Sequence, residues 1–160
     1  KLKFPIWGTL IFNEKIWIAA NKLEMPSQTK RISVPKIILP EMARGRLTEF
    51  HARIDKKLLG RKFYKKPTRD RTLLLAVPER LSGNYHYHVF VRPPPGLQNM
   101  IDFINLAPKI WKNLCKNGDV EFEYLREDVN LIKTSRYSSK ELWRLDNQDN
   151  VVILPERFVI

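Results

Sequence analysis

The chain has 160 residues and a formal net charge of +12, with 29 basic and 17 acidic residues. Hydrophobic residues make up 43% of it, which suffices for a folded core and excludes a disordered chain. No apolar run approaches the roughly 20 residues of a membrane-spanning helix. The single cysteine, Cys115, excludes an internal disulfide and favours a cytoplasmic location.

We expect one domain over residues 1–160, because no linker, repeat or low-complexity tract divides the chain. It begins with Lys1 rather than Met, so we expect it to be part of a longer protein. Between Lys30 and Ser82, fifteen basic residues accompany five acidic ones. This concentration predicts a surface for a polyanion such as DNA, RNA or an acidic membrane, and a solvated basic surface is the alternative. We expect no membrane partner, because the basic residues lack a continuous apolar helix face beside them.

Residues 5–12 and 31–39 predict two short strands, whereas residues 16–30 give no clear pattern. A helix is expected to begin at Pro40 and end at Gly60, with apolar residues at helical spacing. We expect phosphate contacts from basic residues of this helix, of the segment that follows it and of a later strand: Arg53, Lys56, Lys57, Arg61, Lys62, Lys65, Lys66 and Arg92. Phe63 and Tyr64, which lie among these basic residues, could stack on unpaired bases or pack at the helix end.

The second half of the chain predicts two strands, at residues 71–79 and 85–92, joined by a turn of hairpin length. A helical stretch from residue 97 to 118 is expected to restart at Pro108. Further elements are a strand at 119–125, a helix at 130–145 and a strand at 150–154. Strands outnumber crossover helices, which predicts an α+β fold with a mainly antiparallel central sheet.

Two histidines separated by one residue, His86 and His88, lie in the second of the paired strands. Side chains at i and i+2 of a strand point to the same face, and the hairpin brings Glu79 back beside them. Two imidazoles and a carboxylate with open positions predict a site for Mg²⁺ or Mn²⁺. Surface histidines on an edge strand, or histidines stacked on aromatic rings, are the alternatives. The third histidine, His51, is expected to be a surface or half-buried side chain of the first helix.

The helix at residues 130–145 carries Tyr137 and Lys140. On a helix, the spacing i to i+3 places the phenol and the ammonium side by side. The cation favours the phenolate and compensates charge on an attacked phosphate, which predicts Tyr137 as a nucleophile and Lys140 as its partner. An exposed tyrosine on a polar helix is the alternative.

The order of these motifs, "HYH" on a strand followed by a helical region, a strand and "YSSK" on a helix, resembles that of the HUH single-strand DNA endonucleases. It is similar to the single-tyrosine initiators of rolling-circle replication, in which the histidine motif precedes the tyrosine. The resemblance covers roughly residues 71–145. The family also has a Thr-rich strand motif near its start, which "WGTLIF" at residues 7–12 matches loosely.

The resemblance implies an RRM-related architecture, in which helices pack on an antiparallel sheet that carries the H-x-H motif. It implies a metal-dependent nicking and joining endonuclease that cuts single-stranded DNA or an origin hairpin through a 5′-phosphotyrosine, with Glu79 as the third ligand. It also implies a helicase and a DNA polymerase as partners.

Two alternatives are open. A single-tyrosine transposase or a mobilisation relaxase would use the same active residues. A non-catalytic basic domain that binds nucleic acid would not depend on Tyr137.

Overall fold

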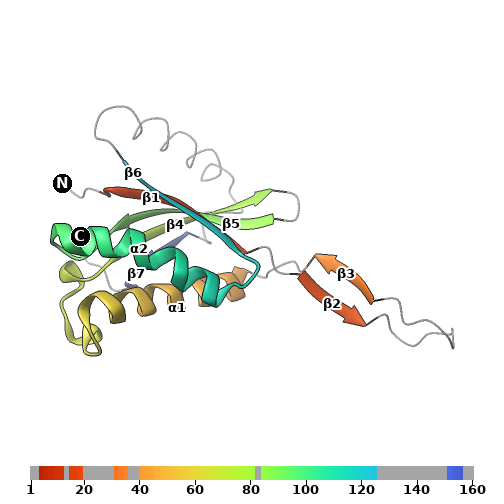
Figure 1. Ribbon diagram of the computed structural model, residues 1–160, viewed down its shortest axis with the longest axis horizontal. Helices are drawn as coiled ribbons and strands as arrows, with labels where there is room; N and C mark the ends of the chain where they lie inside the picture. The colour runs from red at the N-terminus through yellow and green to blue at the C-terminus, as the bar shows by residue number, and fades with distance from the viewer. Residues whose placement is uncertain are drawn as a thin grey trace, which may run out of the picture.

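Five antiparallel strands form one open sheet, and two helices cover one of its faces (Figure 1). The structure is a computed structural model that describes residues 4–12, 15–19, 31–35, 40–81, 84–125 and 151–156. In chain order the elements, with η marking a 3-10 helix, are β1 (Ile6–Ile11), β2 (Lys15–Ala19), β3 (Arg31–Pro35), α1 (Pro40–Leu59), η1 (Phe63–Lys65), η2 (Thr68–Asp70), β4 (Leu73–Leu81), β5 (Asn84–Arg92), α2 (Leu97–Leu114), β6 (Asp119–Tyr124) and β7 (Val152–Leu154). These elements confirm the predicted α+β class.

The strand order is β6-β1-β5-β4-β7, so β5 lies at the centre between β1 and β4. All four neighbouring pairs are antiparallel, which makes β1 parallel to β4 across β5, and β5 parallel to β6 across β1. Helices α1 and α2 belong to the two crossovers between these parallel strands. Strands β2 and β3 form a separate two-stranded sheet within the first crossover. The H-x-H motif therefore sits on an interior strand of the main sheet.

Helix α1 matches its predicted bounds closely. Leu47, Phe50 and Ile54 recur on one face and are fully buried against the sheet and α2. Gly60 follows the helix with φ of +83°, and its N–H donates to the carbonyl of Lys56 at 3.1 Å. Glycine adopts this left-handed conformation without a Cβ clash, so it ends the helix where the sequence predicted.

Helix α2 differs from its prediction, because it runs without a break through Pro108 to Leu114. A proline inside a helix removes one backbone hydrogen bond and costs about 3 kcal/mol. Residues around it, including Ala107, Ile110 and Trp111, are buried in the core. Packing of this apolar face outweighs the local preference of the backbone.

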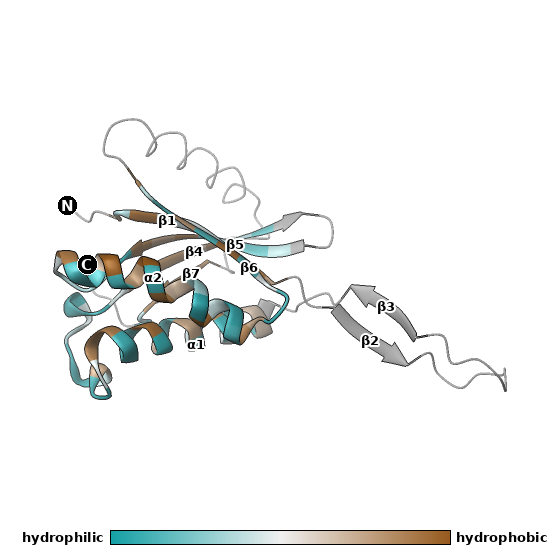
Figure 2. Ribbon diagram, viewed as in Figure 1, coloured by the Kyte–Doolittle hydropathy of each residue, from teal (hydrophilic) through white to brown (hydrophobic). Residues whose placement is uncertain are grey.

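The core lies between the helices and one face of the sheet. In Figure 2 the helices and the strands of this sheet carry the brown colour of hydrophobic residues. Aromatic rings dominate it: Phe12 and Phe50 pack edge-on against Trp111, with ring centroids 5.0 and 5.6 Å apart. The indole N–H of Trp111 donates to the carbonyl of Ile11 at 3.1 Å, which ties α2 to β1. At Gly8 a Cβ would lie 2.4 Å from the ring of Phe122, so only glycine allows that ring to cross β1.

Two further predictions concern the end of the chain. Strand β7 confirms the strand expected at residues 150–154. The helix expected at residues 130–145 lies outside the described residues, and so do Tyr137 and Lys140. Among the helices that the structure describes, none combines the length and the apolar character needed to cross a membrane.

Candidate metal centre

Strand β5 separates its side chains onto two faces, as the sequence predicted. Tyr87, Val89 and Val91 point into the core and are buried there. His86 and His88 point to the opposite face, away from both helices, because alternate residues of a strand face opposite ways. The central position of β5 excludes the alternative of histidines on an edge strand.

Glu79 joins the two histidines from the neighbouring strand. The β4–β5 hairpin places Glu79 directly opposite His86, so their side chains share one face. Its Oε2 atom lies 3.1 Å from Nε2 of His86 and 2.5 Å from Nε2 of His88. The sequence predicted this contact from the length of the hairpin connection.

The three side chains are buried, with between 6% and 9% of each exposed. Each offers one ligand atom, and these atoms all lie within 4.8 Å of one another, so the group could hold a metal ion. Two imidazoles and one carboxylate form a set that suits a divalent ion and leaves further coordination positions for other ligands. Burying a carboxylate and two imidazoles costs free energy, and such residues are rarely buried together without a binding role.

Strand β1 supports His88 from its other side. The Thr9 hydroxyl lies 3.3 Å from Nδ1 of His88. The indole of Trp7 stacks on the same imidazole, with centroids 5.7 Å apart and planes 13° apart. The sequence left aromatic stacking open as an alternative to metal binding. In the structure His88 both stacks on Trp7 and directs Nε2 toward Glu79. Both contacts restrict the ring so that Nε2 stays directed at Glu79.

Sequence reasoning did not assign Thr9 a role. The loose match of "WGTLIF" to a Thr-rich strand motif indicates the segment at residues 7–12, but it does not identify Thr9 as a site residue. The pairing register supplies the missing information, because it sets Thr9 directly opposite His88. Without knowing that β1 and β5 are neighbours, the sequence cannot show this contact.

The sheet face that carries Glu79, His86 and His88, here called the ligand face, extends to the edge strand β6, where its side chains are acidic. Asp119 and Glu121 lie opposite Ile11 and Thr9, in the same rows as His86 and His88, and both are exposed. Glu123 follows two residues later on the same face and is also exposed. These three carboxylates lie on the same face as Glu79, His86 and His88 and add acidic groups that attract cations.

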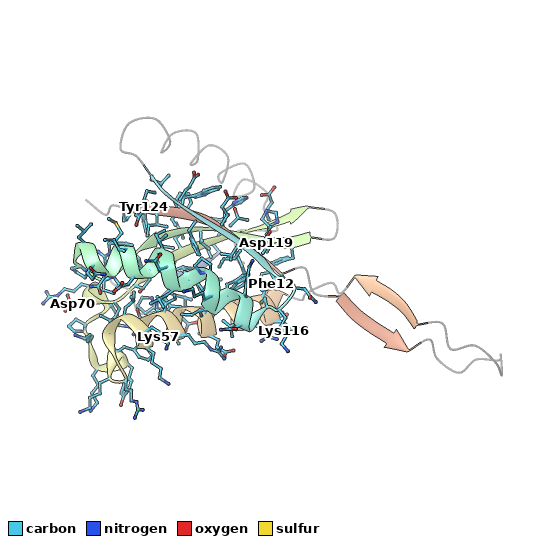
Figure 3. The ribbon with its side chains drawn as sticks, viewed as in Figure 1. Phe12, Lys57, Asp70, Lys116, Asp119 and Tyr124 are labelled. Atoms are coloured by element: carbon cyan, nitrogen blue, oxygen red, sulfur yellow. The ribbon has the colours of Figure 1, made fainter. Side chains whose placement is uncertain are left out.

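The basic residues expected to contact phosphates lie elsewhere. Seven of them are exposed on α1 or on the segment that follows it, in the helix layer: Arg53, Lys56, Lys57, Arg61, Lys62, Lys65 and Lys66. Figure 3 shows Lys57 in this layer and Asp119 on the sheet. Arg92 is on the ligand face, but at the far end of β5, where its Nη2 donates to the carbonyl of Arg69 at 3.2 Å. The structure does not bring these residues together with Glu79, His86 and His88.

None of the described tyrosines is placed to replace Tyr137 as a nucleophile at this centre. Tyr85 and Tyr87 point to the core face, and burial raises the pKa of the Tyr87 phenol, which disfavours the phenolate. Tyr124 lies at the opposite end of β6 from Asp119, and Tyr64 lies in the basic segment of the helix layer. Tyr137 itself is outside the described residues.

His51 is buried rather than at or near the surface, which corrects the sequence prediction. Its Nε2 atom lies 2.7 Å from the carbonyl of Thr72 and 3.9 Å from the carboxylate of Asp55. Burial lowers the pKa of His51 below its ordinary value of 6.5, although the charge of Asp55 acts in the opposite direction. The helix pattern places His51 beside Phe50 but does not show that it is buried. Its burial depends on the segment before β4, where the carbonyl of Thr72 contacts it.

No known protein-family model matches the chain, and no curated protein is recognisably similar to it.

Proposed function

We propose that this protein is a metal-dependent endonuclease and ligase that nicks single-stranded DNA through a covalent phosphotyrosine, as an initiator of rolling-circle replication does. The observation that carries the proposal is the convergence of Glu79, His86 and His88, whose ligand atoms lie within 4.8 Å of one another on an interior sheet surface. The resemblance of "HYH" and "YSSK" to the HUH endonucleases supplies the reaction.

The topology supports the same reading. Apart from the β2–β3 hairpin and β7, the elements follow the order β-α-β-β-α-β, and the sheet order β6-β1-β5-β4 interleaves the two crossovers. This order is consistent with a split β-α-β arrangement and supports the proposed RRM-related architecture. A fold of this kind hosts many functions, so the site and not the fold carries the proposal.

In the proposed reaction, Glu79, His86 and His88 would hold a divalent ion, which when bound would supply Lewis-acid chemistry to the scissile phosphate. The Tyr137 phenolate attacks phosphorus, a bond forms between its oxygen and phosphorus, and the bond from phosphorus to the 3′ oxygen breaks. The 3′ oxygen leaves as a hydroxyl after taking a proton, and the 5′-phosphate stays on Tyr137. Lys140 favours the phenolate and balances charge on the phosphate. The reverse reaction rejoins the strand.

The proposal includes the partners and compartment that this chemistry requires. The substrate is single-stranded DNA or an origin hairpin, and the free 3′ end primes a DNA polymerase after a helicase opens the duplex. The compartment is the cytoplasm in which the DNA replicates. A single-tyrosine transposase or a mobilisation relaxase would use the same residues and differs in the DNA that it recognises.

The proposal is tested by incubating the protein with single-stranded and hairpin oligonucleotides, with Mn²⁺ or with EDTA, and separating the products on a denaturing gel. We expect a covalent protein–DNA adduct with Mn²⁺ that is absent with EDTA and in Tyr137→Phe. The matched control is Tyr124→Phe, whose side chain is 44% exposed, and it should form the adduct normally. An adduct that persists in Tyr137→Phe would refute the assigned nucleophile.

A second candidate function is a basic domain that binds nucleic acid without cutting it. It is favoured by the position of the charged residues, since Asp119, Glu121 and Glu123 share the face of Glu79, whereas seven of the eight basic residues expected to bind phosphates lie in the helix layer. In this case Glu79, His86 and His88 would hold a structural ion. The absence of any adduct with a broad set of oligonucleotides, together with intact DNA binding, would favour this candidate.

A further inference from the structure

Six exposed basic side chains gather where α1 ends and the next segment begins. We call them the basic surface: Lys56, Lys57, Arg61, Lys62, Lys65 and Lys66. Within the part of the chain that the structure describes, none of the six forms an ion pair. Three arginines of α1 and the following segment differ, since Arg44 pairs with Glu156, Arg53 with Glu49 and Arg69 with Asp70. The charge of the basic surface is therefore available to a partner.

A buried polar anchor holds the segment that carries these side chains. Asp55 is fully buried, accepts from Nε of Arg71 at 2.8 Å and accepts from the N–H of Thr72 at 3.0 Å. His51 contacts the carbonyl of Thr72 from the same helix. The guanidinium of Arg71 lies over the ring of Phe63, 5.2 Å from its centroid. These contacts fix both ends of the segment, so its cations are presented on an ordered backbone.

The basic surface is far from the metal centre in two respects. It belongs to the helix layer, whereas Glu79, His86 and His88 lie on the opposite face of the sheet. Its segment enters β4 at Leu73, and Glu79 follows six residues later. At about 3.3 Å per residue, that separation along the strand is about 20 Å. A strand of DNA at the metal centre cannot reach the basic surface without passing around the sheet.

From this arrangement we infer that the basic surface is a second nucleic-acid site, which binds the phosphate backbone of duplex DNA. Sites for single strands combine cations with several aromatic rings on which bases stack. Between residues 56 and 71, all of which the structure describes, Tyr64 is the one well-exposed ring at 63%, and Phe63 is engaged by Arg71. Six cations with a single free ring suit phosphate contacts, which are independent of sequence.

The inference goes beyond the proposed function and does not depend on it, since duplex binding requires neither a metal ion nor Tyr137. It is tested in EDTA by fluorescence anisotropy with a labelled duplex of random sequence over a range of salt concentrations. The test variant is the triple substitution Lys62→Ser, Lys65→Ser and Lys66→Ser. The matched control replaces three exposed lysines, two in the second half of α2 and one just after it, namely Lys109→Ser, Lys112→Ser and Lys116→Ser.

We expect the test variant to weaken duplex binding and to flatten the slope of log affinity against log salt by about 0.9 for each phosphate that the protein no longer neutralises. The control variant should retain the wild-type slope. Equal decreases in both variants, or no decrease in either, would overturn the inference. So would a preference of the basic surface for a single strand of equal length, or for vesicles with anionic lipids. Adduct formation on a short single strand, measured in parallel, reports separately on the proposed function.

Discussion

The hydroxyl of Thr9 lies 3.3 Å from Nδ1 of His88, the ring nitrogen that does not contact Glu79. A hydroxyl can both donate and accept, so Thr9 fits either tautomer of the imidazole. If Nε2 binds an ion, Nδ1 carries the proton, and its N–H donates a hydrogen bond to the Thr9 oxygen. Such a contact orients a metal-binding histidine and makes its other nitrogen a better ligand.

Thr9→Val removes this hydrogen bond and keeps the shape of the side chain. We expect it to weaken Mn²⁺ binding by about 10- to 100-fold, the usual effect of removing such a partner. Isothermal titration calorimetry measures the affinity, and Thr9→Ser, which keeps the hydroxyl, should bind nearly as well as the wild type. An unchanged Mn²⁺ affinity in Thr9→Val would show that Thr9 does not position His88.

Glu79→Gln tests the carboxylate of the metal centre through stability. Bound Mn²⁺ at about 100 times its dissociation constant should raise the free energy of unfolding of the wild type by about 2.7 kcal/mol. We expect the variant to lose most of the corresponding rise in melting temperature, because an amide is a poorer ligand than a carboxylate. Glu123→Gln, an exposed acid on the same face, is the control and should keep the rise. A rise of equal size in both variants would contradict the role of Glu79.

The buried His51 should make stability depend on pH. Its pKa is lowered in the folded protein by burial, whereas the unfolded chain has the ordinary value of 6.5. The unfolded state therefore takes up a proton first as the pH falls, so stability is complete above pH 6.5 and decreases toward the lower folded pKa. The slope contributed by this one proton is at most about 1.4 kcal/mol per pH unit. Urea denaturation at several pH values should show this slope in the wild type and a smaller one in His51→Gln.

Asp55→Asn should destabilise the fold, because it leaves the largely buried guanidinium of Arg71 without its counter-ion. We expect a decrease of about 3 kcal/mol in the free energy of unfolding, measured by denaturant titration at neutral pH. Glu49→Gln is the control, since it breaks an exposed pair with Arg53 on the same helix and should cost about 0.5 kcal/mol or less. Equal effects of the two substitutions would mean that Asp55 is not an anchor.

Local patterns in the sequence were enough to predict α1, the β4–β5 hairpin and the contact between Glu79 and His86. A helical period, a helix-ending glycine and a hairpin turn each act over a few residues, so they can be recognised without the fold. The uninterrupted course of α2 through Pro108 could not be predicted, because packing with the sheet decides it. Thr9 and His51 depend on which strands and loops become neighbours, and a single sequence does not contain that information.

The charge distribution shows the same limit. The sequence has fifteen basic residues between Lys30 and Ser82, but it does not show which side of the sheet they occupy. Seven of these residues are exposed on α1 or just after it, on the side of the sheet away from His86 and His88: Arg53, Lys56, Lys57, Arg61, Lys62, Lys65 and Lys66. Whether the predicted phosphate contacts and the predicted metal ligands lie on one surface therefore depends on the fold and not on the local sequence.

The central claim is that Glu79, His86 and His88 bind one divalent ion. It is tested most directly by the anomalous X-ray scattering of manganese in crystals grown with Mn²⁺. We predict a single strong peak about 2.0–2.2 Å from Nε2 of both histidines and from a carboxylate oxygen of Glu79. Crystals grown in millimolar Mn²⁺ that show no peak there, with the carboxylate still hydrogen-bonded to both imidazoles, would contradict it.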